Sequence, residues 1–164
     1  MTPRGRPKPV LNKRRAARFA AVQALYQLEV GGGRAHDVVA EFDTHRLAQL
    51  FEPLEVEAPS PAVDRTWFAL LVEGAWDKRQ PIDTALETCL SQGWTVARLG
   101  SLLRACLRAG AYEITERTDV PVKAAINEYV ELAHLFLPSD EASFVNAVLD
   151  RLAQQKPRPE EAAL

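Results

Sequence analysis

The sequence predicts an all-α protein, a compact bundle of about seven helices. Apolar residues recur every three or four positions in one segment after another, which is the spacing of a single helical face. β-branched residues never alternate over a run long enough to form a strand. With 164 residues, of which 47% are hydrophobic, the chain has the length of one ordinary domain and enough apolar side chains to fill a core.

The front of the chain predicts a basic arm and two helices. Residues 1–11 contain three prolines and a glycine, which predict an extended and mobile segment. Asn12 is a suitable cap for a helix that runs to about Val30 and stops at the glycines of residues 31–33. A second helix is expected over residues 35–51. Residues 52–62 hold three prolines and three acids, which predict a loop between a smaller front part and a larger back part.

The back of the chain predicts five further helices. Their expected extents are residues 63–77, 81–93, 95–115, 121–136 and 139–154. Asp119 is a suitable cap for the fourth of these helices, and Ser139 for the last. Residues 155–164 contain two prolines and should fray, so residues 12–154 are expected to form the folded domain.

Several classes of protein are excluded by motif and composition. The longest apolar stretches, such as residues 67–72, are far too short for a membrane span, which needs about 20 residues. Two cysteines, Cys89 and Cys106, make neither a disulfide framework nor a zinc site, so a reducing cytoplasm is expected. His36 and His45 stand half a helical turn out of phase, which argues against a metal site. No phosphate-binding glycine motif or catalytic triad motif is present. We therefore expect no enzyme activity and no cofactor.

Positive charge is concentrated at the N-terminus. Residues 1–18 carry seven Lys and Arg and no acid, so residues 19–164 carry a formal charge of −9 against −2 for the whole chain. Arg14, Arg15 and Arg18 have the spacing of one helical face. Because cations near a helix N-terminus oppose its dipole, this placement favours a site for phosphate over a merely solubilising segment.

Three other features are candidates for binding. Arg104, Arg108 and Tyr112 share a helical face, and they can hold an RNA base or a protein partner. Taken alone, they are better explained by ion pairing with Glu113, Glu116 or a carboxylate of another helix. Phe144 stands slightly off the apolar stripe of the last helix, as an exposed partner contact would, although core packing is the commoner role. Asn146 and Asp150, one turn apart, can satisfy buried backbone groups or bind a partner.

Four segments resemble one known family. They are RRAARFAAVQALYQ at residues 14–27, LRAGAYE at 107–113, VPVKAAINEYVELA at 120–133 and FVNAVLDRL at 144–152. In this order and spacing they resemble the motifs of the NusB transcription antitermination factors, over about residues 12–154. The resemblance implies an all-helical fold with two packed subdomains and no enzyme activity.

The resemblance also implies partners. NusB proteins pair with a small-subunit ribosomal protein, called NusE in this role, and the pair binds single-stranded boxA RNA. This binding supports processive transcription of ribosomal RNA operons by RNA polymerase in an antitermination complex. Some members self-associate, so a homodimer is compatible with the resemblance, whereas a membrane partner is not expected.

Site residues follow from the same resemblance. It assigns RNA contact to Lys13, Arg14, Arg15, Arg18 and Tyr26. It assigns the partner surface to Tyr26, Arg104, Arg108, Tyr112, Asp140 and Phe144.

The chain departs from the family pattern at three positions. Leu103 replaces an acid that faces NusE, Ser143 replaces a lysine, and Ala16 stands where an arginine is common. Each departure removes one polar contact, for which the basic arm can compensate through long-range charge. Two other functions stay open at this point: an RNA-targeting domain that serves rRNA modification, and a helical interaction domain without RNA binding.

Overall fold

Helix α1 (Lys13–Gly31) is the first element of the computed structural model, which describes residues 11–52 and 62–155. It begins as the sequence predicts, because the Asn12 side chain accepts a hydrogen bond of 2.8 Å from the Arg15 backbone N–H. It ends at the glycines, where Gly32 has a φ of 74°. The predicted arm, loop and frayed tail lie almost wholly outside the described residues.

The second predicted helix is interrupted. Helix α2 (Ala35–Glu41) passes into a single π-helical turn, η1 (Phe42–Arg46), and does not continue to residue 51. In the wider turn, the Leu47 N–H binds the Phe42 carbonyl at 2.9 Å. Phe42, Leu47 and Phe51 are all buried as a result. A regular α-helix would turn Phe42 and Leu47 to different faces, so packing of both side chains explains the change.

Helix α3 (Arg65–Asp77) matches its prediction closely. The Asp64 carboxylate caps it by accepting a hydrogen bond of 3.0 Å from the Trp67 N–H. Helix α4 (Arg79–Glu87) begins earlier than expected and ends six residues before Gly93.

The helix predicted over residues 95–115 is divided in two. A short 3-10 turn, η3 (Val96–Arg98), is followed by extended backbone at Leu99 and then by α5 (Ser101–Glu116). The Arg104 guanidinium donates to the carbonyls of Leu99 at 2.8 Å and Ala97 at 3.3 Å. Because the guanidinium supplies donors to these carbonyls, they do not need the backbone N–H groups of a continuous helix, and Leu99 turns into the core.

Helices α6 (Val122–Phe136) and α7 (Ser139–Gln155) complete the chain. The capping role predicted for Asp119 is wrong. Its carboxylate accepts a hydrogen bond of 3.1 Å from Arg117, and Pro121 occupies the cap position of α6 without a side-chain bond.

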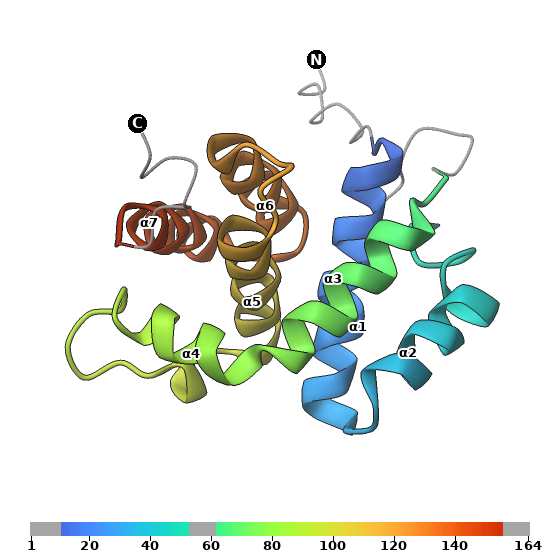
Figure 1. Cartoon of the computed structure of the whole chain (residues 1–164), viewed down its shortest axis with the longest axis horizontal. Coiled ribbons are helices and arrows are strands. Elements are labelled where there is room, and N and C mark those ends of the chain that lie inside the picture. The colour runs from blue at the N-terminus through green and yellow to red at the C-terminus, as the bar shows by residue number, and fades with distance from the viewer. Residues whose placement is uncertain (1–10, 53–61, 156–164) are drawn as a thin grey trace, which may run out of the picture.

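The seven α-helices of the described residues form two groups joined along α1 and α5 (Figure 1). Helix α1 packs against α3 in the first group and against α5 in the second, while α6 and α7 pack against each other and against α5. No strand occurs in residues 11–52 and 62–155, and the prediction of an all-α fold is confirmed.

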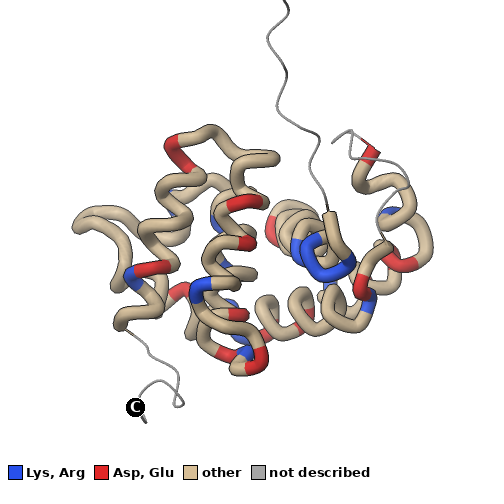
Figure 2. The backbone as a smooth tube through the Cα atoms, turned by 90° about the horizontal axis from the view of Figure 1, so that it is seen from above, with Lys and Arg blue, Asp and Glu red and all other residues tan. Residues whose placement is uncertain are grey.

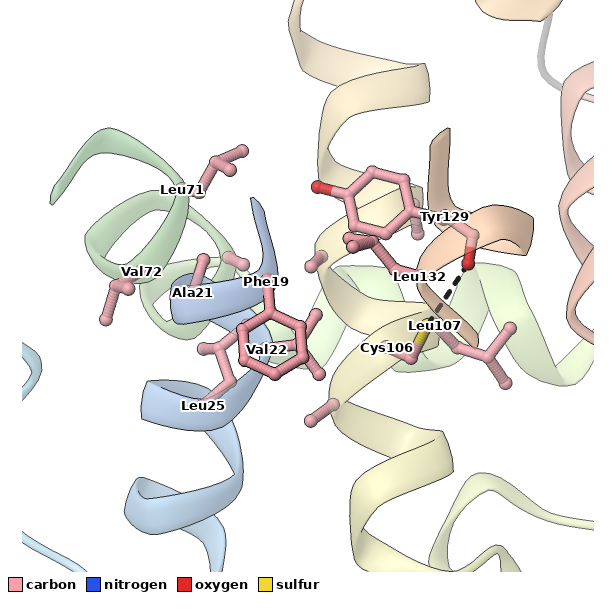
Figure 3. Packing of buried hydrophobic residues seen from close by; sticks show 14 of the residues in the cluster. Phe19, Ala21, Val22, Leu25, Leu71, Val72, Cys106, Leu107, Tyr129 and Leu132 are labelled. Atoms are coloured by element: carbon pink, nitrogen blue, oxygen red, sulfur yellow. Dashed lines mark hydrogen bonds between the residues drawn. The ribbon is translucent and has the colours of Figure 1, made fainter. Parts of the chain in front are cut away.

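One hydrophobic core connects the two groups. Figure 3 shows Phe19 and Val22 of α1 on the side toward Cys106 of α5 and Leu132 of α6, while Leu107 of α5 points away from α1. Small residues on α1, including three alanines that are completely buried at positions 20, 21 and 24, let the neighbouring helices approach closely. In the described part of the chain, no helix has the length and apolar character needed to cross a membrane.

Candidate functional site

The basic side chains at the start of α1 have different environments. Figure 2 shows Lys and Arg gathered on the first turns of this helix. Lys13 and Arg14 are exposed, Arg15 is half-buried, and only 4% of Arg18 is exposed. The sequence predicted one compact cationic patch from the spacing of the three arginines. The structure corrects this prediction, since Arg18 points into the protein and the exposed patch consists of Lys13, Arg14 and part of Arg15.

Arg18 forms a buried ion pair with α5. Its Nε and Nη2 atoms donate to the two carboxylate oxygens of Glu113 at 2.8 and 2.9 Å. The Tyr129 hydroxyl of α6 donates to the same carboxylate. Burial lowers the pKa of Arg18, but the hydrogen bond and charge of Glu113 outweigh it and raise the pKa overall. Burial also raises the pKa of Tyr129, and the Glu113 charge adds to the effect. Three helices therefore meet at one polar cluster.

Arg15 lies between this cluster and the surface. It donates to the Glu128 carboxylate of α6 through Nε at 2.7 Å and Nη2 at 3.0 Å. The hydrogen bond from Arg15 lowers the pKa of Glu128, although partial burial acts in the opposite direction. About a quarter of the Arg15 side chain, 28%, is still exposed, so it can reach a ligand at the surface.

Arg14 lies over an aromatic ring. Its Cζ atom is 4.2 Å from the centre of the Trp67 ring on α3, and Arg117, at the end of α5, approaches the same ring to 5.1 Å. Guanidinium groups at these distances are attracted by the negative face of the indole. From the sequence, Trp67 was expected only as part of an apolar stretch, and Arg117 was given no role. No motif connects the two residues, because they come together only in the tertiary structure.

The arginines predicted for the partner surface are held by carboxylates of other helices. Arg108 donates to both oxygens of Asp83 at 2.8 and 2.7 Å and to Glu29 at 2.8 Å, and Arg104 pairs with the other Glu29 oxygen. Only 7% of Arg108 is exposed, which corrects its expected place on an outer face. Burial opposes the charge of Arg108, but Asp83 and Glu29 raise its pKa overall. Ion pairing with another helix is therefore confirmed, with partners that the sequence did not indicate.

The two tyrosines of the predicted interfaces differ in exposure. Tyr26 on α1 is 39% exposed and lies one helical turn before Glu29. Tyr112 on α5 is half-buried against Gly74 of α3. A Cβ atom at Gly74 would lie 2.3 Å from the tyrosine ring, so the glycine makes room for Tyr112.

A groove of about 450 Å³ lies between the start of α7 and the segment that precedes and begins α5. Its lining includes Trp94, Arg98, Leu103, Asp140, Glu141 and Phe144. The Arg98 Cζ atom lies 5.1 Å from the centre of the Trp94 ring, and 51% of Trp94 is exposed. The groove therefore brings together the predicted partner residues Asp140 and Phe144 and adds exposed Trp94, to which no sequence motif points.

The departures from the family pattern have defined places. Leu103 is buried and lines the groove with apolar surface, and Ser143 is exposed. Ala16 is completely buried, so an arginine at this position would need a different packing of α1.

Other reactive side chains are poorly placed for chemistry. Burial raises the pKa of the Cys106 thiol to about 12, and its Sγ atom lies 3.9 Å from the Tyr129 carbonyl (Figure 3). Asn146 and Asp150, expected either at a helix contact or at a partner surface, are both exposed on α7. Within residues 11–52 and 62–155, no three His, Cys, Asp or Glu side chains are grouped as metal ligands would be.

The class of protein defined by this architecture is an all-α bundle in which a cationic helix end and an aromatic groove lie on the surface. Residues 15–154 match the model of the NusB family. The chain is 45% identical over 150 residues to the transcription antitermination protein NusB of Allorhizobium ampelinum, covering 91% of both chains. It is 46% identical over 154 residues to the protein of that name in Sinorhizobium fredii, covering 94% of both. The chain belongs to the NusB family, as its motifs predicted.

Solved structures agree with this assignment at the level of the fold. A T. maritima NusB structure superposes with a TM-score of 0.66 at 24% identity, covering 94% of this chain and all of that one. NusB from Aquifex aeolicus gives 0.68 at 22% identity, covering 88% and 89%. A structure titled as the antitermination factors NusB and NusE in complex with dsRNA gives 0.66 at 21% identity, covering 86% and 96%.

Proposed function

We propose that this protein is a non-enzymatic transcription antitermination factor that binds boxA-type single-stranded RNA together with NusE. Bound in this way, it would support transcription of ribosomal RNA operons within the antitermination complex of RNA polymerase. Its relatives are named transcription antitermination proteins, and a NusB of the same fold occurs in a solved complex with NusE and RNA.

The observation that carries the RNA part of the proposal is the environment of Arg14. This residue is exposed, and within the described part of the chain it forms no ion pair. It lies beside Lys13, in the first turn of α1, where its charge opposes the helix dipole. A bound phosphate would neutralise the charge of Arg14 and offset its unfavourable interaction with the helix dipole. Phosphate contacts also supply most of the affinity of protein–RNA interfaces of this kind.

The five predicted RNA residues take different roles in this proposal. Lys13 and Arg14 contact phosphate directly, and Arg15 does so by exchanging part of its bond to Glu128. Arg18 is a positioning residue that fixes α1 against α5 through Glu113. Tyr26 lies about 18 Å further along the helix, so an extended strand is needed to reach both ends, and its exposed ring offers a stacking surface for a base.

NusE is assigned to the surface that runs from Tyr26 to the groove. Aromatic and apolar side chains at Trp94, Leu103 and Phe144 provide a desolvated centre, and Asp140 provides a polar edge. Arg104 and Arg108 support this surface from beneath, because their ion pairs with Glu29 join α1 to α5.

The first experiment measures binding of a fluorescently labelled boxA-type RNA by anisotropy over a series of salt concentrations, with and without NusE. We expect binding that NusE strengthens. The double variant Lys13→Gln/Arg14→Gln should weaken it about tenfold or more and flatten its salt dependence. Arg79→Gln is the matched control. The Arg79 Cζ atom lies 4.2 Å from the centre of the Trp76 ring, the same distance as between Arg14 and Trp67, and Trp76 is about 14 Å along α3 from Trp67.

The NusE part is tested separately by calorimetric titration with NusE alone. Phe144→Ala should weaken this binding by tenfold or more if the groove holds NusE, as expected for an aromatic at the centre of an interface. Ser143→Ala, at the exposed neighbouring position, is the control. Full NusE affinity in Phe144→Ala would remove the groove from the interface. Wild-type protein that binds NusE but no RNA would instead be an interaction domain.

A further inference from the structure

Trp67 lies next to three arginines, which come from two places in the chain. Arg14 and Arg18 of α1 and Arg117 after α5 have their Cζ atoms 4.2, 5.9 and 5.1 Å from its ring centre. The ring itself is only 4% exposed, so it serves as a fixed base for the side chains around it. We call Arg14, Trp67 and Arg117 the Trp67 cluster.

The charges of this cluster are unequally compensated. Arg18 is neutralised by the buried Glu113. Arg117 pairs with the carboxylate of Asp119 at 3.1 Å, and Asp119 is half exposed to solvent. Arg14 forms no such pair within the described residues. Burial is the largest single influence on the pKa of Asp119 and raises it, but hydrogen bonding and the charges of Arg117 and Arg14 together outweigh burial and lower the pKa. One carboxylate therefore lies in the field of two arginines.

Hydrogen-bond donors also exceed acceptors here. Trp67 Nε1 and Arg117 Nε are both buried, and neither donates to a protein atom of the described chain. Buried N–H groups are nearly always paired, so two such donors in one cluster indicate a place suited to an acceptor-rich group. A phosphodiester offers unesterified oxygens that accept several bonds and carry the opposite charge.

We propose that Arg117 is a second RNA-contacting arginine, held beside Arg14 by the Trp67 ring and released from Asp119 when phosphate binds. This inference rests on the proposed RNA-binding function. It extends the RNA surface from the start of α1 to the end of α5, across α3. Stacking on the indole restricts both guanidinium groups before binding, which lowers the entropy lost when they contact the backbone.

A purely structural role is the competing explanation for Arg117. A cation at the end of α5 is favoured by the helix dipole, and Asp119 could be its sole partner. A structural role accounts for the charge of Arg117. It does not account for the position of Arg117 against the Trp67 ring, which Arg14 also contacts. The two explanations differ in the salt dependence of RNA binding, which a structural role would leave unchanged.

The test compares the RNA affinity of Arg117→Gln, Arg14→Gln and Arg79→Gln with that of the wild type over a salt series, using the boxA-type RNA and saturating NusE. We expect Arg117→Gln to weaken binding about fivefold and to lower the slope of log affinity against log salt by about 0.7, the value for one phosphate contact of a single strand. Arg14→Gln should act similarly, and Arg79→Gln should match the wild type. Arg117→Lys, which retains the charge, should recover much of the slope.

Asp119→Asn supplies a second and independent measurement. If Arg117 exchanges Asp119 for phosphate, Asp119→Asn should strengthen RNA binding, and this gain should be lost in the Arg117→Gln background. Loss of slope in Arg14→Gln with a wild-type slope in Arg117→Gln would overturn the inference about Arg117 and leave the proposed function standing. Absence of RNA binding by the wild type, with and without NusE, would overturn both.

Discussion

Three arginines within five residues of α1 show how far burial differs between neighbouring side chains. Arg14 is exposed and lies over Trp67. Arg15 is partly exposed and pairs with Glu128, and Arg18 is buried with Glu113. Their order follows the turn of the helix toward α5 and α6. The inner two arginines therefore fix the helix that presents the outer one, so in the proposed function stability and RNA binding are assigned to different members of the same motif.

The buried pair predicts a large loss of stability when its carboxylate is removed. Glu113→Gln leaves the charge of Arg18 uncompensated in the core, and we expect it to lower the free energy of unfolding by about 3–5 kcal/mol. Urea denaturation followed by circular dichroism measures this. Glu116→Gln, which removes the carboxylate of an exposed ion pair with Lys78, should unfold like the wild type. Equal stability of the two variants would mean that the Arg18 pair contributes little.

Glu128 predicts a specific dependence of stability on pH. Its pKa is lowered in the folded protein, chiefly by Arg15, so its contribution is present above the unfolded value near 4.5 and is lost as the pH falls through the folded value. At pH 7 we expect Glu128→Gln to be less stable by about 1 kcal/mol, and this difference should shrink below pH 4.5. Thermal unfolding at a series of pH values tests it, with exposed Glu131→Gln as control. A constant difference would contradict the assignment.

At the scale of the elements, helix ends are set by different causes. Asn12, predicted as a cap, and Asp64, which was not, cap α1 and α3 with side chains that directly precede these helices. The start of α5 depends on a distant residue, because the carbonyls of the preceding segment are held by Arg104, whose guanidinium is in turn paired with Glu29 of α1. Local signals thus locate the ends that are capped locally, and they miss an end that a distant helix defines.

Gly110 predicts a close contact between α5 and its neighbours. A Cβ atom there would lie 2.8 Å from Leu149 Cδ1 and 3.3 Å from the Tyr129 ring. We expect Gly110→Ala to lower stability by about 1–2 kcal/mol, because overpacking exceeds the gain in helix propensity. Gly31→Ala, also helical but with open space around it, should be neutral or stabilising by up to about 1 kcal/mol. Chemical denaturation of both variants gives the comparison, and a stabilised Gly110→Ala would disprove the tight contact.

At the scale of the whole molecule, the distribution of charge separates an N-terminal basic segment from an acidic body. Four of the seven cations in residues 1–18 lie in the described part of α1, and one of these, Arg18, is neutralised inside the protein. If the proposed function holds, we expect long-range attraction of RNA to depend on Lys13, Arg14 and Arg15 together with the charges of the arm.

Deletion of residues 1–10 tests the contribution of the arm. It removes Arg4, Arg6 and Lys8 but leaves Asn12, which caps α1, so the fold should remain. We expect lower RNA affinity and a salt slope reduced by up to about 0.7 for each lost phosphate contact. Arg4→Gln/Arg6→Gln/Lys8→Gln, which keeps the length, should reproduce the effect. An unchanged slope would show that the arm does not compensate for the contacts missing at Leu103, Ser143 and Ala16.

The sequence by itself determined the fold class, the approximate extent of most helices and the family. Helical periodicity, side-chain caps and the proline and glycine breaks all act within a few residues, so they can be read without knowledge of the partners of each segment. The tertiary structure decided which charges are available. Whether an arginine pairs with Glu113, Glu29 or Asp83, or stacks on Trp67, depends on residues tens of positions away. Burial and ion pairing are properties of the assembled helices, and no local pattern specifies them.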